Sequence, residues 1–235
     1  MSRSLEDISK TLAVIQILTE HDIPCCCVGI SALKLYGARR MRSTWEICVP
    51  ADLVPLAEHL FRSDGAFASL EPKKPAPVSR IHAYSRFGTC GSNHEFVIVP
   101  DCDVHLDCRA VEITHSLRGL PYPSLKDFAQ SCIDRRSHVE LCDFVDGTNL
   151  SEEWGEENLD LNGMHDVRWV RNMQAKKDVC PRWWPTRPKQ KREIWQSYVR
   201  TKEQRLDCSR PPSRYVTQYR HIGSKDPWTM LSDAS

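Results

Sequence analysis

The 235-residue sequence has no apolar run close to the roughly 18 residues that a membrane-spanning helix needs. Charged residues precede the first apolar stretch, and no small-residue cleavage site follows, so we predict no secretory signal and a cytoplasmic location. The motifs G-x-S-x-G, H-E-x-x-H and G-x-G-x-x-G and the P-loop are also missing. These absences leave the hydrolase, zincin, kinase and Rossmann classes without support.

The sequence also has no C-x-x-C pair, although it contains 11 cysteines. Their odd number and the missing export signal speak against a disulfide framework. Cys25, Cys26 and Cys27 are contiguous, and alternate side chains of a strand point to opposite faces, so the three thiols cannot converge on one ion. We therefore predict reduced cysteines that act as small buried hydrophobes, and no metal site.

Hydrophobic periodicity divides the chain into two parts. Strands are expected at 25–30, 45–49, 81–87, 95–99 and 104–108, with helices at 4–20, 31–36 and 51–62. Further helices are expected at 124–133, 138–145, 151–158, 167–177 and 191–206. The sequence thus predicts an α+β fold with a mixed sheet over residues 1–120, followed by a helical region over 121–235.

The formal charge of +1 conceals a strong polarity along the chain. From Asp166 to Lys225 there are 16 Lys and Arg against 5 Asp and Glu, so this stretch carries +11 and the other 175 residues carry −10. Aromatic residues interleaved with cations suit RNA, whose bases stack and whose phosphates need neutralising. The candidate RNA-binding residues are Lys189, Lys191, Arg192, Arg200, Lys202 and Arg205.

An alternative reading of this polarity needs no RNA, because the basic helices can pack against the acidic remainder of the same chain. An acidic run around Trp154 offers such a surface, and we favour a neutralised face over a guanidinium-binding site there. The run consists of Asp143, Asp146, Glu152, Glu153, Glu156 and Glu157.

Two neighbouring segments carry a resemblance to a known family. The first, VGISALKLYG, runs over 28–37, and the second, RSTWEICV, runs over 42–49. Together they resemble the minimal nucleotidyltransferase family, in which a Gly-Gly or Gly-Ser turn, Ala-Leu and Tyr-Gly precede R-x-T-x-D-x-D. The resemblance implies a nucleotidyltransferase-like fold and substrate contacts from Gly29, Ser31, Arg42 and Thr44.

The chemistry of this family needs paired carboxylates that hold divalent metal ions against a nucleotide triphosphate. Here Glu46 takes the first carboxylate position and Cys48 the second, and a thiol is a poor ligand for magnesium. Asp103, His105 and Asp107 alternate along an expected strand, so they would share one face near Glu46. The predicted catalytic group is Glu46, Asp103, His105 and Asp107, and the alternative is an ordinary polar strand face.

These observations favour a transferase that has been repurposed on a nucleotidyltransferase-like fold. More loosely, the chain resembles the fungal arginine-containing cyclodipeptide synthases, which use charged tRNA to join arginine to a second amino acid. That resemblance implies tRNA and an aminoacyl group as partners and no cofactor, with the acidic residues holding the arginyl group or moving protons. A nucleotidyltransferase with a shifted, Mg²⁺-binding carboxylate site and a non-catalytic RNA- or protein-binding scaffold remain the alternatives.

Overall fold

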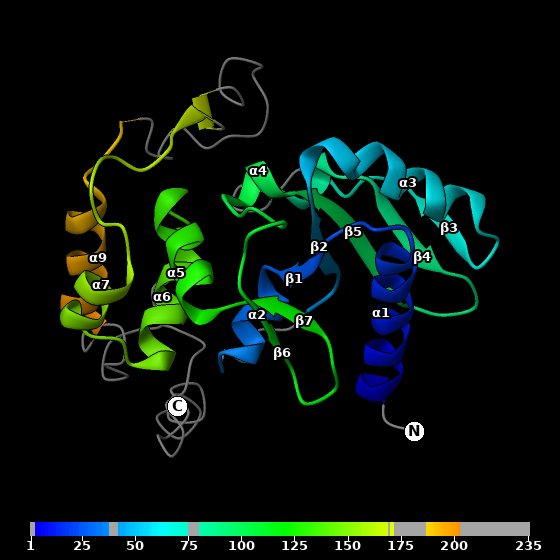
Figure 1. Ribbon diagram of the computed structural model, residues 1–235, viewed down its shortest axis with the longest axis horizontal. Coiled ribbons are helices and arrows are strands. Elements are labelled where there is room, and N and C mark those ends of the chain that lie inside the picture. Colours follow the sequence, from blue (N-terminus) through cyan, green and yellow to red (C-terminus); the bar gives the residue numbers. More distant parts are fainter. Residues whose placement is uncertain (1–2, 38–41, 75–79, 169, 172–186, 203–235) are drawn as a thin grey trace, which may run out of the picture.

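A mixed five-stranded sheet forms the centre of the fold (Figure 1). The computed structural model describes residues 3–37, 42–74, 80–168, 170–171 and 187–202. The strands follow one another across the sheet in the order β1 (Cys26–Val28), β2 (Trp45–Val49), β5 (Glu95–Pro100), β4 (Arg86–Thr89) and β3 (Phe67–Leu70). Only β2 and β5 among these neighbours run parallel. The predicted α+β class with a mixed sheet and flanking helices is therefore confirmed.

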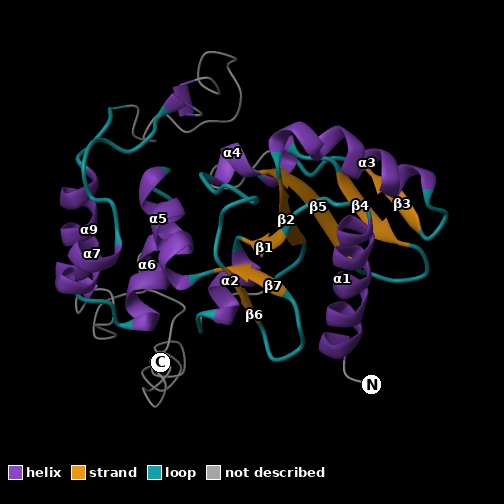
Figure 2. Cartoon of the chain, in the orientation of Figure 1, coloured by secondary structure: helices purple, strands orange, loops and turns teal. Residues whose placement is uncertain are grey.

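Two helices cover one face of this sheet, α1 (Arg3–Glu20) and α3 (Val54–Ser63), which follows the 3-10 turn η1 (Ala51–Leu53) (Figure 2). Their apolar residues Leu18 and Phe61 are fully buried, and they share one core with Ile47 of β2 and Phe96 of β5. The alternation along each strand sends every second side chain into this core.

The opposite face of the sheet carries a smaller apolar cluster. It is covered by the short helix α4 (Asp101–Val104), the 3-10 turn η2 (Ile81–Ala83) and the loop that follows α4. Its buried members are Cys26, Val28, Cys48, Tyr84, Val97, Val99, Val104 and Cys108. Glu46 and Cys48 both project to this second face, because residues two apart on a strand point the same way.

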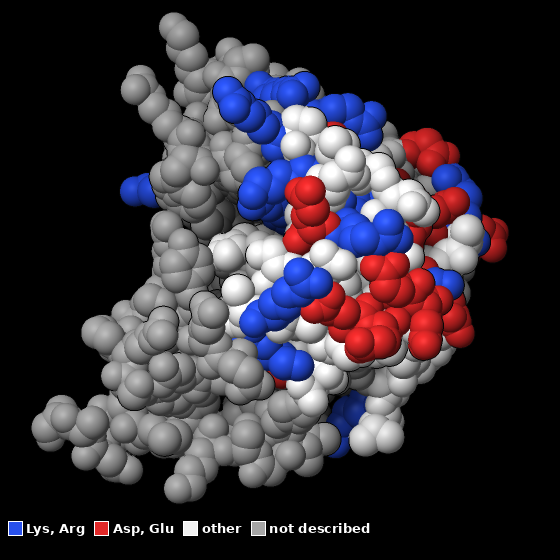
Figure 3. Space-filling model, turned by 90° about the vertical axis from the view of Figure 1, so that its left-hand side faces the viewer, with Lys and Arg blue, Asp and Glu red and all other residues white. Residues whose placement is uncertain are grey.

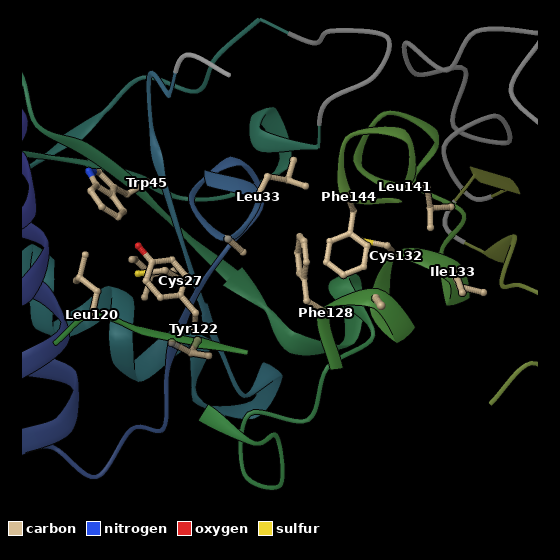
Figure 4. Packing of buried hydrophobic residues seen from close by; sticks show 14 of the residues in the cluster. Cys27, Leu33, Trp45, Leu120, Tyr122, Phe128, Cys132, Ile133, Leu141 and Phe144 are labelled. Atoms are coloured by element: carbon tan, nitrogen blue, oxygen red, sulfur yellow. The ribbon is translucent and has the colours of Figure 1, made fainter. Parts of the chain in front are cut away.

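The remaining helices pack beside the sheet. They are α2 (Ile30–Leu35), α5 (Leu125–Asp134), α6 (His138–Thr148), α7 (Glu152–Asn158) and α9 (Lys191–Arg200). Ser124 and Ser151 cap α5 and α7, as their side chains accept backbone N–H groups. Phe128 and Phe144 continue the larger core from the sheet into these helices (Figure 4). The boundary near residue 120 stays a prediction.

Several expected elements differ from the structure. The strand expected at 104–108 is wrong, because Asp101–Val104 forms a helical turn after Pro100 and His105 has a left-handed φ of 52°. Of the strand expected at 81–87, only the end belongs to β4, because Ile81–Ala83 forms η2. Neither β3 nor the hairpin of β6 (Ile113–His115) and β7 (Pro121–Pro123) is predicted by the sequence. These strands have three or four residues, too few to show a period.

Two of the expected helices lie partly outside the described residues. Of the helix expected at 167–177, the structure describes residues 167–168 and 170–171. Of the helix expected at 191–206, it describes α9 and the two residues that follow. Among the helices that the structure describes, none is both long and apolar enough to span a membrane.

Candidate active site

A cavity of about 260 Å³ lies on the second face of the sheet, between β2, η2 and the turn that joins α5 to α6. Its charged and hydroxyl-bearing lining consists of Glu46, Arg80, Tyr84, Arg135, Arg136, Ser137 and Glu140. Apolar residues complete the wall, among them Ile30 and Val99. Concave, largely apolar sites with a few convergent polar groups are where ligands usually bind.

Glu46 is held in this cavity by the start of α2. The backbone N–H of Ile30 donates a hydrogen bond to its carboxylate. The preceding Gly29 has φ 59° and ψ −136°, and a Cβ built there would lie 2.1 Å from Glu46 Oε1. Only glycine therefore fits at residue 29, for backbone and for space. The predicted site residue Gly29 thus contributes by making room for the carboxylate.

The surroundings of Glu46 shift its ionisation toward neutral pH. Burial and, to a smaller extent, the charge of Glu140 raise the pKa of the carboxyl to about 7, against the opposing effects of Arg135 and the Ile30 N–H. The side chain is still partly exposed to solvent. A partly accessible carboxyl with this pKa can both accept and release a proton near neutral pH.

Three arginines give the cavity its cationic character. Arg135 forms an ion pair with Glu140, and Arg80 Nη1 donates to the backbone oxygen of Asp103. Arg136 Nη1 is buried and has no hydrogen-bond partner among the described residues. A buried donor of this kind is costly unless a ligand or water satisfies it. The cavity thus has cationic donors in its wall that suit an anionic or carbonyl oxygen.

Asp103 lies at the edge of the same site. Its Oδ2 accepts a hydrogen bond from the Tyr84 hydroxyl at 3.0 Å. Burial raises the pKa of Tyr84, and the charges of Asp103 and Glu46 add to the increase, so both carboxyls act on this hydroxyl. Of the four predicted catalytic residues, only Glu46 lines the cavity, and Asp103 is linked to it through the cavity residue Tyr84.

The other two predicted catalytic residues lie elsewhere. His105 Nε2 is 3.4 Å from Asp166 Oδ2, and Asp107 Oδ1 accepts the backbone N–H of Arg109 at 2.9 Å. Neither residue lines the cavity. The expected single face fails because this segment is a helical turn and a loop, in which residues two apart do not project together.

The predicted substrate contacts Ser31, Arg42 and Thr44 do not line the cavity either. The guanidinium of Arg42 stacks over the ring of Trp45 at 3.3 Å, and Lys73 donates to Thr44. Ser31 is buried, with its hydroxyl 3.5 Å from Arg42 Nη1.

The residues around Glu46 do not fit a magnesium pair of the kind that the family resemblance implies. The second carboxylate position holds Cys48, which is fully buried among apolar side chains. The parallel strand β5 places Val97 opposite Glu46 and Val99 opposite Cys48. The other carboxylate that lines the cavity, Glu140, is paired with Arg135. Hard cations need several oxygen ligands, and the strands here supply one.

The predicted RNA-binding residues on α9 are engaged within the chain. Arg192 pairs with Glu156 and Arg200 pairs with Glu152, both through two guanidinium nitrogens. Lys191 pairs with Asp134 at 2.7 Å. Figure 3 views the side of the molecule where α7 and α9 lie, and there basic and acidic residues adjoin each other. Glu152 and Glu156 of the acidic run thus neutralise two arginines of α9, as the favoured reading predicts for these two residues, whereas Asp143 and Asp146 of the run are buried in α6.

Further contacts complete this picture. Lys202 donates to Asn149 Oδ1, and the backbone of Lys189 hydrogen-bonds to His165, while Arg205 lies outside the described residues. Trp195 and Tyr198, two aromatics of the basic stretch, are buried and so are not exposed for stacking on bases. RNA binding stays a prediction.

Sequence reasoning missed most of the cavity wall. Arg80, Tyr84, Arg135, Arg136 and Glu140 come from segments with no recognisable motif. They meet only through the tertiary arrangement of η2 and the α5–α6 turn, so no spacing in the sequence could reveal them. The adjacent arginines 135 and 136, at the end of a helix, are the one local signal.

Comparisons with known proteins give little guidance. No family model matches the chain, and no curated protein matches it. Among solved structures, the antibiotic-resistance factor ANT(2'')-Ia, an aminoglycoside nucleotidyltransferase, matches with a TM-score of 0.36 at 10% identity, over 84% of each chain. This likeness concerns the general α+β arrangement and gives no weight to any particular reaction.

Proposed function

We propose that the cavity around Glu46 is the active site of a transferase that moves a proton through Glu46 and needs no magnesium pair. The observation that carries this proposal is the fixed carboxylate. It accepts the Ile30 N–H, lies in an arginine-lined cavity, and lacks the second carboxylate that a metal would need. Its raised pKa supports the assignment, because a general base works best when its pKa is near the working pH.

Acyl transfer from an activated ester to an amine suits this arrangement. The amine nitrogen attacks the ester carbonyl carbon, the new N–C bond forms, and the Glu46 carboxylate takes the amine proton. The negative charge on the carbonyl oxygen is stabilised by the arginine side chains, chiefly by the unsatisfied Nη1 of Arg136. The C–O bond then breaks, and Glu46 returns the proton to the leaving oxygen.

Two aminoacyl-tRNAs are the activated esters that we propose. The first transfer gives a dipeptidyl-tRNA and releases one tRNA, and attack of the dipeptide's free amine on its own ester carbonyl then closes the cyclic dipeptide and releases the second tRNA. The three arginines of the cavity outnumber its two glutamates, so the cavity favours anionic and carbonyl groups over a guanidinium. Our proposal is therefore aminoacyl transfer without a role for this cavity in binding an arginyl group.

Nucleotidyl transfer is the second candidate, and the arginines favour it because guanidinium groups bind phosphate oxygens well. Here an acceptor hydroxyl would give its proton to Glu46. Its oxygen would then bond to the α-phosphorus as the bond to pyrophosphate breaks. The misfit of the magnesium pair places this candidate second.

One experiment separates these functions. The purified protein is incubated with total tRNA, amino acids, aminoacyl-tRNA synthetases and ATP, with tRNA omitted as the control, and small molecules are identified by mass spectrometry. A parallel incubation uses α-labelled nucleoside triphosphates and acceptor RNA, with and without a chelator. We expect a tRNA-dependent cyclic dipeptide that Glu46→Gln abolishes and that Glu157→Gln, an exposed control, leaves unchanged.

The other outcomes count against acyl transfer. Label transfer that Glu46→Gln abolishes would establish nucleotidyl transfer, and its loss with chelator would show that magnesium is required. No product in either incubation, with the charged tRNA intact, would favour a non-catalytic scaffold.

A further inference from the structure

The second face of the sheet carries a group of thiols that the sequence analysis did not foresee. The Sγ atoms of Cys26, Cys48 and Cys108 all lie within 4.8 Å of one another. Cys26 and Cys48 are directly opposite each other on the antiparallel strands β1 and β2. Cys108 comes from the loop that follows α4 and lies across both strands.

We propose that Cys26, Cys48 and Cys108 bind one thiophilic d¹⁰ metal ion, Zn²⁺ or Cu⁺, that fastens this loop to the sheet. The prediction of no metal site considered only the contiguous cysteines and cysteines close in sequence. Here one cysteine from each of three separate segments supplies a sulfur, and strand alternation is satisfied because Cys26 and Cys48 share one face.

The sulfur spacing is closer to a metal site than to a disulfide. With a metal–sulfur distance of about 2.3 Å, tetrahedral or trigonal ligation places sulfurs about 3.8 to 4.0 Å apart. Cys48 Sγ and Cys108 Sγ are 3.3 Å apart, so they need to separate by about half an ångström. A disulfide of about 2.05 Å would need them to approach by about twice as much.

Ion pairs and hydrogen bonds anchor the loop that carries Cys108 next to the cysteine itself. Arg109, the next residue, forms a two-pronged ion pair with Asp52, which lies in η1 directly after β2. Asp107 closes a turn by accepting the Arg109 N–H, and Asp101 Oδ1 accepts the N–H of Ala51 at 3.0 Å. These contacts hold the third sulfur against the other two without help from a disulfide.

The environment selects the kind of ion. Cys26 and Cys48 are fully buried among Val28, Val97 and Val99, so the donor set is three sulfurs in an apolar shell. Thiolates of this kind select Cu⁺ or Zn²⁺ over the hard ions that prefer oxygen. Cu⁺ is satisfied by three sulfurs, whereas Zn²⁺ takes a fourth ligand.

An entry route is present on the Cys108 side. Cys108 is 7% exposed and, with Cys25 and Ile113, lines a surface cavity of about 490 Å³. An ion or a fourth, solvent-derived ligand can approach Cys108 from this cavity. The site is separate from the Glu46 cavity, so its test does not depend on the proposed transferase.

Metal titration of the full-length protein tests the proposal. The reduced, chelator-treated protein is titrated without oxygen, with Co²⁺ as a spectroscopic probe for the zinc site and with Cu⁺ in competition with a colorimetric chelator. We expect one ion per chain by native mass spectrometry, with thiolate-to-cobalt charge-transfer bands if the ion is of the zinc type. Binding should weaken at least tenfold in Cys48→Ser and Cys108→Ser. Cys132→Ser, an equally buried thiol outside the group, should bind as the wild type does.

A second measurement needs no variant and so does not depend on a variant folding. Iodoacetamide labelling of Cys108, followed by peptide mass spectrometry, should be at least tenfold slower in the metal-loaded wild type. Binding that survives both serine substitutions, or no binding of either ion, would overturn the proposal. It would also fail if the protein purified without reductant held a Cys48–Cys108 disulfide and no metal.

Discussion

Replacing Gly29 by alanine should remove Glu46 from its position and abolish transfer. The added Cβ would lie 2.1 Å from Oε1 and 2.4 Å from the carboxyl carbon, whereas ordinary contacts begin near 3.4 Å. The carboxyl must therefore retreat by more than 1 Å and lose the Ile30 N–H. Backbone strain at φ 59°, ψ −136° costs about 1–3 kcal/mol, and crowding of the buried carboxyl adds about 1–3 kcal/mol.

Gly91→Ala separates the two effects. Gly91 also has a positive φ, 72°, but nothing lies within 4 Å of the Cβ that alanine would add. In urea unfolding at pH 7, Gly91→Ala should lose only the backbone-strain energy of about 1–2 kcal/mol, and Gly29→Ala should lose more. In the transfer assay, Gly29→Ala should form no product. Equal losses of stability in the two variants, with transfer retained by Gly29→Ala, would refute the close approach of this glycine to Glu46.

Three further outcomes follow from buried groups. Because the pKa of Glu46 is raised from 4.5 to about 7, stability is lost as pH rises through that range, so Glu46→Gln should match the wild type at pH 4 and exceed it at pH 8, by up to about 3 kcal/mol in urea unfolding. Burial lowers the pKa of His94 from 6.5 to about 4, so stability is present above pH 6.5 and is lost as pH falls toward 4. The test compares the double variant Glu46→Gln/His94→Gln with the single variant Glu46→Gln. The added His94→Gln change should remove the loss of stability at low pH, which amounts to up to about 3 kcal/mol. Gly155→Ala should lower stability by about 3 kcal/mol or more in thermal unfolding, because its Cβ would lie 2.0 Å from Trp195 Nε1, whereas Gly65→Ala, with nothing within 4 Å, should not.

The elements that the sequence predicts well are those with a clear period or a clear end. The strand expected at 45–49 coincides with β2, and the helix expected at 4–20 differs from α1 by one residue. Both have apolar residues at regular spacing, and that spacing is fixed by burial against a neighbour. Short elements such as β3 lack this signal, so tertiary contacts determine them.

The candidate site was only half visible in the sequence for a related reason. Glu46 and Gly29 are predicted as site residues only through the family resemblance of the segments 28–37 and 42–49, and the structure places them in contact. The misplacement of Asp107 has a local cause, because Asp101, Cys102 and Asp103 followed by Val104 fit an alternating strand as well as the helical turn that forms. Pro100 and the left-handed backbone at His105 decide whether the strand or the helical turn forms. The alternation of polar and apolar residues contains no information on either.

Two residues on one strand face carry the two chemistries that we propose. Glu46 and Cys48 occupy the positions at which the family that the sequence resembles would hold paired carboxylates, yet the neighbours of each are different. Glu46 meets the start of α2 and the arginines of the cavity, whereas Cys48 meets the sulfurs of Cys26 and Cys108. A hard-cation site needs both positions to converge on one ion, and here the strand presents one carboxylate to a cavity and one thiol to an apolar cluster. The scaffold is thus compatible with proton transfer at one position and soft-metal binding at the other, and neither activity requires the other.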